Sequence, residues 1–159
     1  MFDCSICIAS TDLELLSPAL KQLRVLGLHV APGDPTGGSF SGAVRHIPAE
    51  LDALALFVSS GTINHEREWA ELWMRCQRLR FFYFRACDDV AGDAEVTLKR
   101  FAEAGKSLRL VGLQSAVHNV ERDSEDGSVR LSKKWSERKV EYRGVGDFDC
   151  PEWDWLTLG

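Results

Sequence analysis

The stretch Leu54–Ser59, with the sequence LALFVS, decides the fold class together with the segment His65–Trp73 that follows it. The first part is a short apolar run that ends in small polar residues, which is typical of a strand buried in a parallel sheet. The second part opens an amphipathic helix, because Trp69, Leu72 and Trp73 fall on one face of a 3.6-residue period. Strand–turn–helix units of this kind build open α/β sheets, in which ligands bind at the carboxyl ends of the strands.

The same alternation of apolar runs and helical stripes continues on both sides of this unit. It predicts an α/β fold with a central five-stranded parallel sheet in a three-layer sandwich. The segment that follows the first strand is predicted to be a helix that ends at Gly27 as a C-cap. No internal repeat is evident. The predicted strands are residues 3–9, 28–31, 54–59, 81–86 and 108–113.

The C-terminal part of the chain has a different character. Residues 117–159 are predicted to be an irregular extension packed on the α/β domain of residues 1–116. In Val129–Tyr142 charges separate the apolar residues without a helical stripe, which favours a hairpin-like or irregular segment. The aromatic end at Trp153–Leu156 indicates docking onto the domain or onto a partner.

Composition narrows the class of protein. The 159 residues are enough for one domain with a buried core, and 45% of them are hydrophobic. The net charge of −5 disfavours a nucleic-acid partner held by its phosphates. No apolar stretch is long enough to cross a membrane, and the N-terminus carries no cleavable signal, so a cytoplasmic protein is expected.

The cysteines and the glycine-rich stretch give no cofactor motif. Five cysteines, an odd number, favour free thiols over a disulfide framework. Cys4 and Cys7 are expected to hold no metal, because strand positions three apart point to opposite faces. Pro32–Gly42 is predicted to be a loop over the strand ends, and its glycines fit neither a phosphate loop nor a dinucleotide fingerprint.

Several segments together resemble the TIR (Toll/interleukin-1 receptor-like) domains, as a divergent bacterial-type member. Phe2–Asp12 is similar to the family's opening YDVFISYASED, and Gly27–Val30 stands where the family has G-L-x-V. Leu56–Ser59 is similar to the family's VVLIS, and Glu71-Leu72 falls on the family's E-L. Arg67 stands where the family usually has tryptophan. The resemblance implies a flavodoxin-like arrangement of the sheet.

The resemblance also implies an activity, the cleavage of NAD at the nicotinamide–ribose bond, with NAD as substrate and no cofactor or metal. Glu71 is the implied catalytic residue, since a carboxylate can stabilise the cation-like ribosyl centre of such a reaction. Glu68, which flanks the apolar stripe of the helix more closely, is the reserve candidate. The candidates for binding the nucleotide are Ser10, Asp12, Phe40 and Arg67.

Three interpretations of function follow. The first is an assembly-dependent NAD nucleosidase in signalling or defence, favoured by the register of Glu71. The second is a non-catalytic TIR-like protein–protein interaction module, favoured by Arg67 and by the altered loop. The third is a small acidic inhibitor or immunity-type protein, whose charge would suit a basic partner. The expected partners are NAD or a related nucleotide, further copies of the chain or another protein, and neither nucleic acid nor membrane.

Overall fold

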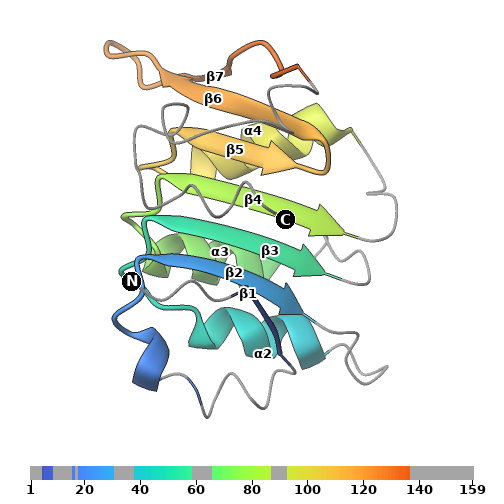
Figure 1. Ribbon diagram of the computed structural model, residues 1–159. Coiled ribbons are helices and arrows are strands. Elements are labelled where there is room, and N and C mark those ends of the chain that lie inside the picture. The colour runs from blue at the N-terminus through green and yellow to red at the C-terminus, as the bar shows by residue number, and fades with distance from the viewer. Residues whose placement is uncertain are drawn as a thin grey trace.

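Parallel strands form most of one seven-stranded sheet, which Figure 1 shows face on. The computed structural model describes residues 5–8, 16, 18–30, 38–58, 66–86 and 93–136, without the side chains of 5–8 and 38–41. The strands are hydrogen-bonded in the order in which they follow one another along the chain. The parallel strands are β1 (Ser5–Ile8), β2 (Val25–Val30), β3 (Ala53–Val58), β4 (Phe81–Ala86) and β5 (Leu110–Leu113). Two antiparallel strands, β6 (Ala116–Arg122) and β7 (Val129–Leu131), complete the sheet.

The α/β class and the mostly parallel sheet are confirmed. Each of the predicted apolar runs overlaps one of the strands β1–β5, but β2 begins three residues before the predicted run 28–31. The prediction of Gly27 as a helix C-cap is wrong, because β2 already begins at Val25. Gly27 pairs with Ser5 of β1 and Ala55 of β3, so pairing on both sides draws these residues into the sheet.

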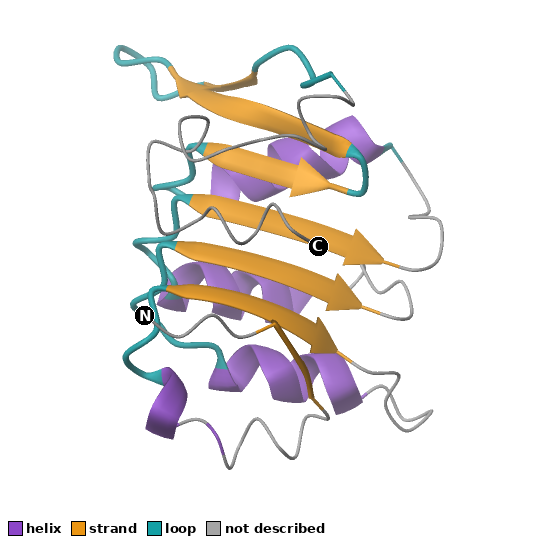
Figure 2. Cartoon of the chain, in the orientation of Figure 1, coloured by secondary structure: helices purple, strands orange, loops and turns teal. Residues whose placement is uncertain are grey.

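The helices lie behind the sheet, on a single face of it (Figure 2). The helices that pack on it are α2 (Gly38–His46), α3 (Glu66–Arg75) and α4 (Ala94–Ala104), and residues 16 and 18–20 are helical as well. Parallel strands joined by right-handed crossovers place every helix on the same face when each strand is added beside the previous one. A flavodoxin-like sheet has the order 2-1-3-4-5, whereas here β2 lies between β1 and β3. The flavodoxin-like order and the three-layer sandwich are therefore not confirmed.

The strand–helix units repeat along the chain, so the expectation of no internal repeat is wrong. Four strands share a pattern that starts two residues before the strand. It consists of an apolar residue followed by two more, at the third and fifth positions after it, and is written L-x-x-L-x-L. The first residues of these patterns are 28, 28 and 29 residues apart. The patterns are Leu23–Leu28, Leu51–Leu56, Leu79–Phe84 and Leu108–Leu113.

A repeated backbone contact holds these units in register at the amino ends of the strands. The carbonyl oxygen of Arg24 accepts hydrogen bonds from the N–H groups of Asp52 (2.7 Å) and Ala53 (3.1 Å). The carbonyl oxygens of Asp52 and Arg80 accept the same pair of bonds from the following strand, at the same two distances. The residue that precedes one strand therefore sets the position of the following strand.

The core behind the sheet is dominated by aromatic side chains from α3, β4 and α4. Phe82 of β4 is fully buried. Its ring meets those of Trp73, Phe101 and Trp69 edge-on, with centroids 5.0, 5.3 and 5.8 Å away. Edge-to-face pairs of this kind add to the free energy of burial. None of the helices in the described ranges is long and apolar enough to cross a membrane.

The segment Val129–Tyr142, predicted to be hairpin-like or irregular, contains only β7, the second strand of the β6–β7 hairpin, and residues 137–142 lie outside the described residues. β6 begins at Ala116 and pairs with β5, so the start of the predicted extension at residue 117 falls inside a strand of the sheet. Tyr83, Gly112 and Val117 meet on one face of the sheet, where a Cβ on Gly112 would collide with the ring of Tyr83. Glycine is therefore required at this position.

Truncating the central aromatic residue should strongly destabilise the fold. Phe82→Ala removes a fully buried ring and leaves a cavity, which costs about 3–5 kcal/mol of the free energy of unfolding. Met74→Ala, at a side chain that is 69% exposed on α3, is the control and should change it by about 0.5 kcal/mol or less. Urea unfolding measures both, and similar losses for the two variants would contradict this core.

The buried thiol of Cys76 should make stability depend on pH in the alkaline range. Sγ donates to the carbonyl oxygen of Pro48 at 3.4 Å. Burial raises the pKa of the Cys76 thiol from its ordinary value of 9.0 to about 11, although Arg75 favours the thiolate. Between these values the folded state binds more protons than the unfolded chain, so the free energy of unfolding falls as the pH rises. The loss should reach about 2–3 kcal/mol near pH 11.

Urea unfolding of the wild type and of Cys76→Ala at pH 8 and at pH 10.5 measures this effect. As the pH rises, the free energy of unfolding of the wild type should fall more than that of Cys76→Ala, because only the wild type has this thiol. A difference that does not change with pH would contradict the assignment.

Candidate functional site

The carboxyl edge of the sheet, where the sequence places the site, is described only in part. Strands β2, β3 and β4 end there, and α2, α3 and α4 begin from it, because each helix returns along its strand. The connections 31–37, 59–65 and 87–92 lie outside the described residues, and so do the predicted binding residues Ser10 and Asp12. The placement of these two residues against the rest of the predicted site is therefore not tested.

Helix α3 carries both candidate carboxylates on the side that faces α2. Arg75, at the end of α3, donates to the carbonyl oxygens of Val44 (3.0 Å), Arg45 (2.6 Å) and Ile47 (2.8 Å) at the end of α2. Glu71 precedes Arg75 by one helical turn and therefore lies on the same side. Glu71 is half-buried there, midway along the helix.

Glu68 lies nearer to the strand ends than Glu71 does. It precedes Glu71 by one turn on the same side of α3 and is also half-buried. Arg67 is exposed in the first turn of the same helix. Phe40, expected in a loop, lies within α2 instead, so the predicted loop is wrong for residues 38–42. The structure thus brings Glu68 and Glu71 together on one helix, beside the helix that carries Phe40.

The face of the sheet opposite the helices carries a set of side chains that the sequence analysis missed. We call it the front face, and Figure 1 views the molecule from this side. Its amino half is buried, whereas in its carboxyl half His29 and Phe57 are half-buried and Arg85 is exposed. A partial signal was present in the sequence, because these residues alternate with the repeated apolar residues of the L-x-x-L-x-L patterns. The front-face residues are Val25, Gly27 and His29 of β2, Ala53, Ala55 and Phe57 of β3, Phe81, Tyr83 and Arg85 of β4, and Leu110 and Gly112 of β5.

The exposed half of the front face consists of one row across three strands. His29, Phe57 and Arg85 are direct neighbours in the strand register. The rings of His29 and Phe57 stack with centroids 4.4 Å apart and planes 11° apart. Arg85 is exposed beside them, while the two rings are half-buried. The row therefore presents an aromatic surface next to a cation.

A turn at the carboxyl edge is fixed to the strands beside this row. Gln114, between β5 and β6, has a φ of 53°, which a non-glycine residue rarely adopts. The Tyr83 hydroxyl donates to its carbonyl oxygen at 2.6 Å, and its side-chain amide donates to the carbonyl oxygen of Ala86 at 2.9 Å. Its own N–H binds the carbonyl oxygen of Phe84 at 3.0 Å. These contacts hold the end of β4 rigidly beside Arg85.

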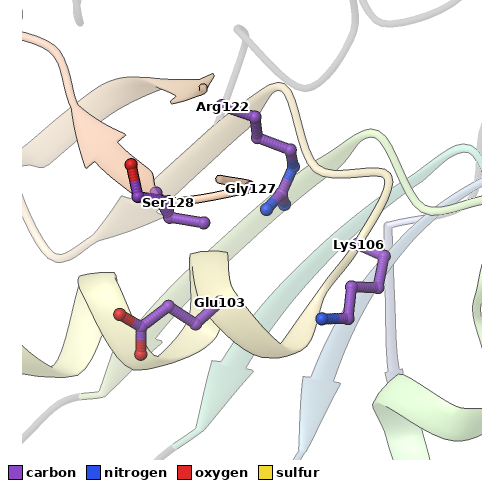
Figure 3. A pocket seen from close by; sticks show the side chains of 6 residues that line it. Glu103, Lys106, Arg122, Gly127 and Ser128 are labelled. Atoms are coloured by element: carbon purple, nitrogen blue, oxygen red, sulfur yellow. The ribbon is translucent and has the colours of Figure 1, made fainter. Parts of the chain in front are cut away.

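A depression of about 380 Å³ lies at the opposite, amino-terminal edge of the sheet (Figure 3). Arg122 reaches into it and donates to the carbonyl oxygens of Ala102 (2.8 Å) and Gly105 (2.6 Å) at the end of α4. Burial lowers the pKa of the Arg122 guanidinium. Arg122 thus caps α4 in the way that Arg75 caps α2, and the contacts of both arginines are structural.

Removing one of these caps should cost much more than removing a surface arginine. Arg75→Ala leaves three carbonyl oxygens without their charged donor, and the expected loss is about 1.5–3 kcal/mol. Arg78→Ala is the matched control three residues away, because its exposed ion pair with Glu50 (3.1 Å) is worth about 1 kcal/mol or less. Thermal or urea unfolding of both variants provides the measurement. Equal losses would show that Arg75 does not anchor α2.

Comparison with known proteins does not extend this picture. The described residues contain no group of three or more His, Cys, Asp or Glu side chains that could hold a metal ion. No family model, curated protein or solved structure matches the chain.

Proposed function

We propose that the chain is a protein–protein interaction module of the repeat type. The observation that carries this proposal is the row of His29, Phe57 and Arg85 on the exposed half of the front face. Units of 28–29 residues with an L-x-x-L-x-L pattern resemble leucine-rich repeats, in which strand–helix units stack and share one core. Stacked repeats present extended surfaces that bind other proteins.

The chemistry of the row suggests what the partner offers. Arginine and aromatic side chains are the residues that most often dominate binding energy at protein interfaces. Arg85 can form charge-assisted hydrogen bonds with a carboxylate. The half-buried rings of His29 and Phe57 can cover an apolar side chain beside it. The proposed partner is therefore a protein segment with an acidic residue next to an apolar one.

The NAD nucleosidase implied by the TIR resemblance is the competing proposal. Glu71 lies on α3, one helical turn before Arg75, the residue that caps α2. It is therefore on the side of α3 that faces α2. Glu68 is closer to the strand ends than Glu71. The strand order also provides no point where neighbouring crossovers diverge, which is where open α/β sheets form their ligand crevices.

Selection of displayed random peptides on the immobilised full-length chain tests the proposed module. We expect enriched peptides to pair an acidic with an apolar residue. Arg85→Glu and Phe57→Ala should each weaken their binding by roughly thirtyfold or more, because each removes a central contact worth about 2 kcal/mol. Arg130→Glu, which reverses an exposed charge on β7 away from the row, should leave the affinity unchanged.

Two results would overturn the interaction module. One is binding that survives both Arg85→Glu and Phe57→Ala, or no enrichment at all. The other is release of nicotinamide from NAD by the wild-type chain, at high concentration or fused to a multimerising partner, that is lost in Glu71→Gln. That substitution keeps the size of the side chain and deletes the negative charge that the ribosyl centre needs. Glu68→Gln serves as its control one helical turn away.

A further inference from the structure

Strand β7 forms one edge of the sheet. It is the last strand in the hydrogen-bonded order and lies at the top of Figure 1. In the described part of the chain, β6 is its only neighbouring strand. An edge strand presents N–H and C=O groups to which a strand of another chain can bind. The outer side of β7 is therefore a candidate contact surface.

The hydrogen bonds of the hairpin identify the groups that point outward. Ser128 and Ser132, which flank β7, each form a 2.9 Å backbone hydrogen bond with the other arm of the hairpin. Bonded residues alternate along an antiparallel ladder, so Arg130, midway between the two serines, is bonded to β6 as well. Val129 and Leu131 therefore direct their N–H and C=O groups away from β6. Their apolar side chains are half-buried.

The two ends of this edge carry opposite charges. The turn before β7 is acidic, the segment after it is basic, and all the charged side chains are exposed. Residues 128–132 separate the two groups, and five extended residues span about 17 Å. This exceeds the screening length of about 8 Å at physiological ionic strength, so the groups attract each other little within one chain. The acidic residues are Asp123, Glu125 and Asp126, and the basic residues are Lys133 and Lys134.

This charge pattern selects one way of adding a strand. Charged side chains usually discourage the pairing of an edge strand with another chain. A second β7 in parallel orientation would place the two acidic turns side by side, and the lysines likewise. In antiparallel orientation each acidic turn lies beside the lysines of the other copy, and opposite charges on neighbouring strands attract. The edge is therefore complementary to itself.

The backbone and the charges agree on the register. Glu125 is four residues before Val129, and Lys133 is four residues after it. A twofold axis at Val129 therefore brings Glu125 opposite Lys133 of the second copy. The outward N–H and C=O groups of the two Val129 residues can then bond to each other. An axis at Arg130 would instead place this arginine opposite its own copy, which is unfavourable.

We propose that two copies of the chain associate through antiparallel pairing of their β7 strands, with the twofold axis at Val129. The partner is a second copy, because one patch supplies both the outward backbone groups and both signs of charge, as an isologous interface requires. The sheet then continues from one copy into the other. This contact does not depend on the proposed partner binding, because the row of His29, Phe57 and Arg85 lies on β2, β3 and β4.

Sedimentation equilibrium of the full-length chain measures this association. We expect a monomer–dimer equilibrium for the wild type. Glu125→Lys and Lys133→Glu should each weaken the dimer by roughly tenfold, because each turns two attractive pairs into repulsive ones. The double variant Glu125→Lys/Lys133→Glu exchanges the charges and should restore the dimer, as should an equal mixture of the two single variants. Lys99→Glu, at an exposed position on α4, is the matched control and should not change the association.

A cysteine at the proposed axis tests the register. Val129→Cys places two Cα atoms about 5.5 Å apart across the axis, a distance that allows an intermolecular disulfide. Leu131→Cys is the matched control, because its two copies lie four residues apart along the strands, or about 13 Å, and should not crosslink. Peptide mapping by mass spectrometry distinguishes the new disulfide from one formed by a native cysteine.

Several results would overturn the proposal. One is a wild type that stays monomeric at about 1 mM, since its Kd is then weaker than that value. Another is an assembly larger than a dimer, which a head-to-tail contact produces. Failure of the exchanged charges to restore the dimer would overturn the antiparallel contact, and a crosslink at Leu131 in place of Val129 would overturn the register. None of these results bears on the peptide binding of the row, so the two proposals fail independently.

Discussion

The bifurcated hydrogen bond in front of each strand is the constraint on which the rest of the molecule depends. A single carbonyl oxygen, first of Arg24, then of Asp52, then of Arg80, receives two N–H groups from the following strand. Each contact fixes the register of one unit against the next, and the register aligns the apolar residues of the L-x-x-L-x-L patterns in layers behind the sheet. Because side chains alternate along a strand, a slip of one residue would exchange the two faces.

Sequential addition of strands has a consequence for function. When every crossover proceeds in the same direction, all helices gather on one face, and no crevice opens between diverging crossovers. The helix-bearing face is then committed to the core, which the aromatic side chains around Phe82 fill. The amino half of the other face is also buried, and the row of His29, Phe57 and Arg85 lies in its carboxyl half. A surface rather than a cleft is thus the feature that the topology provides.

The ends of the helices show how each unit is tied to its neighbours. Arg75 of α3 satisfies the last carbonyl oxygens of α2, Ser107 donates to the carbonyl oxygen of Gln77 after α3 (2.6 Å), and Arg122 of β6 satisfies those of α4. Every one of these donors comes from the unit that follows in the chain. Helix ends would otherwise leave carbonyl oxygens without partners. The capping of one unit therefore depends on the folding of the next, as expected for stacked repeats.

The sequence by itself determined the elements, because apolar runs and helical stripes are local properties. It predicted the α/β class and an apolar run that overlaps each of the five parallel strands. It did not predict the β6–β7 hairpin at its place, and it misassigned Gly27, whose conformation depends on pairing with β1 and β3. Only the tertiary structure decided the order of the strands, the single helix-bearing face and the position of Glu71 against α2, because these depend on long-range pairing. The row of His29, Phe57 and Arg85 was hidden for the same reason: its members are 28 residues apart and meet only in the sheet.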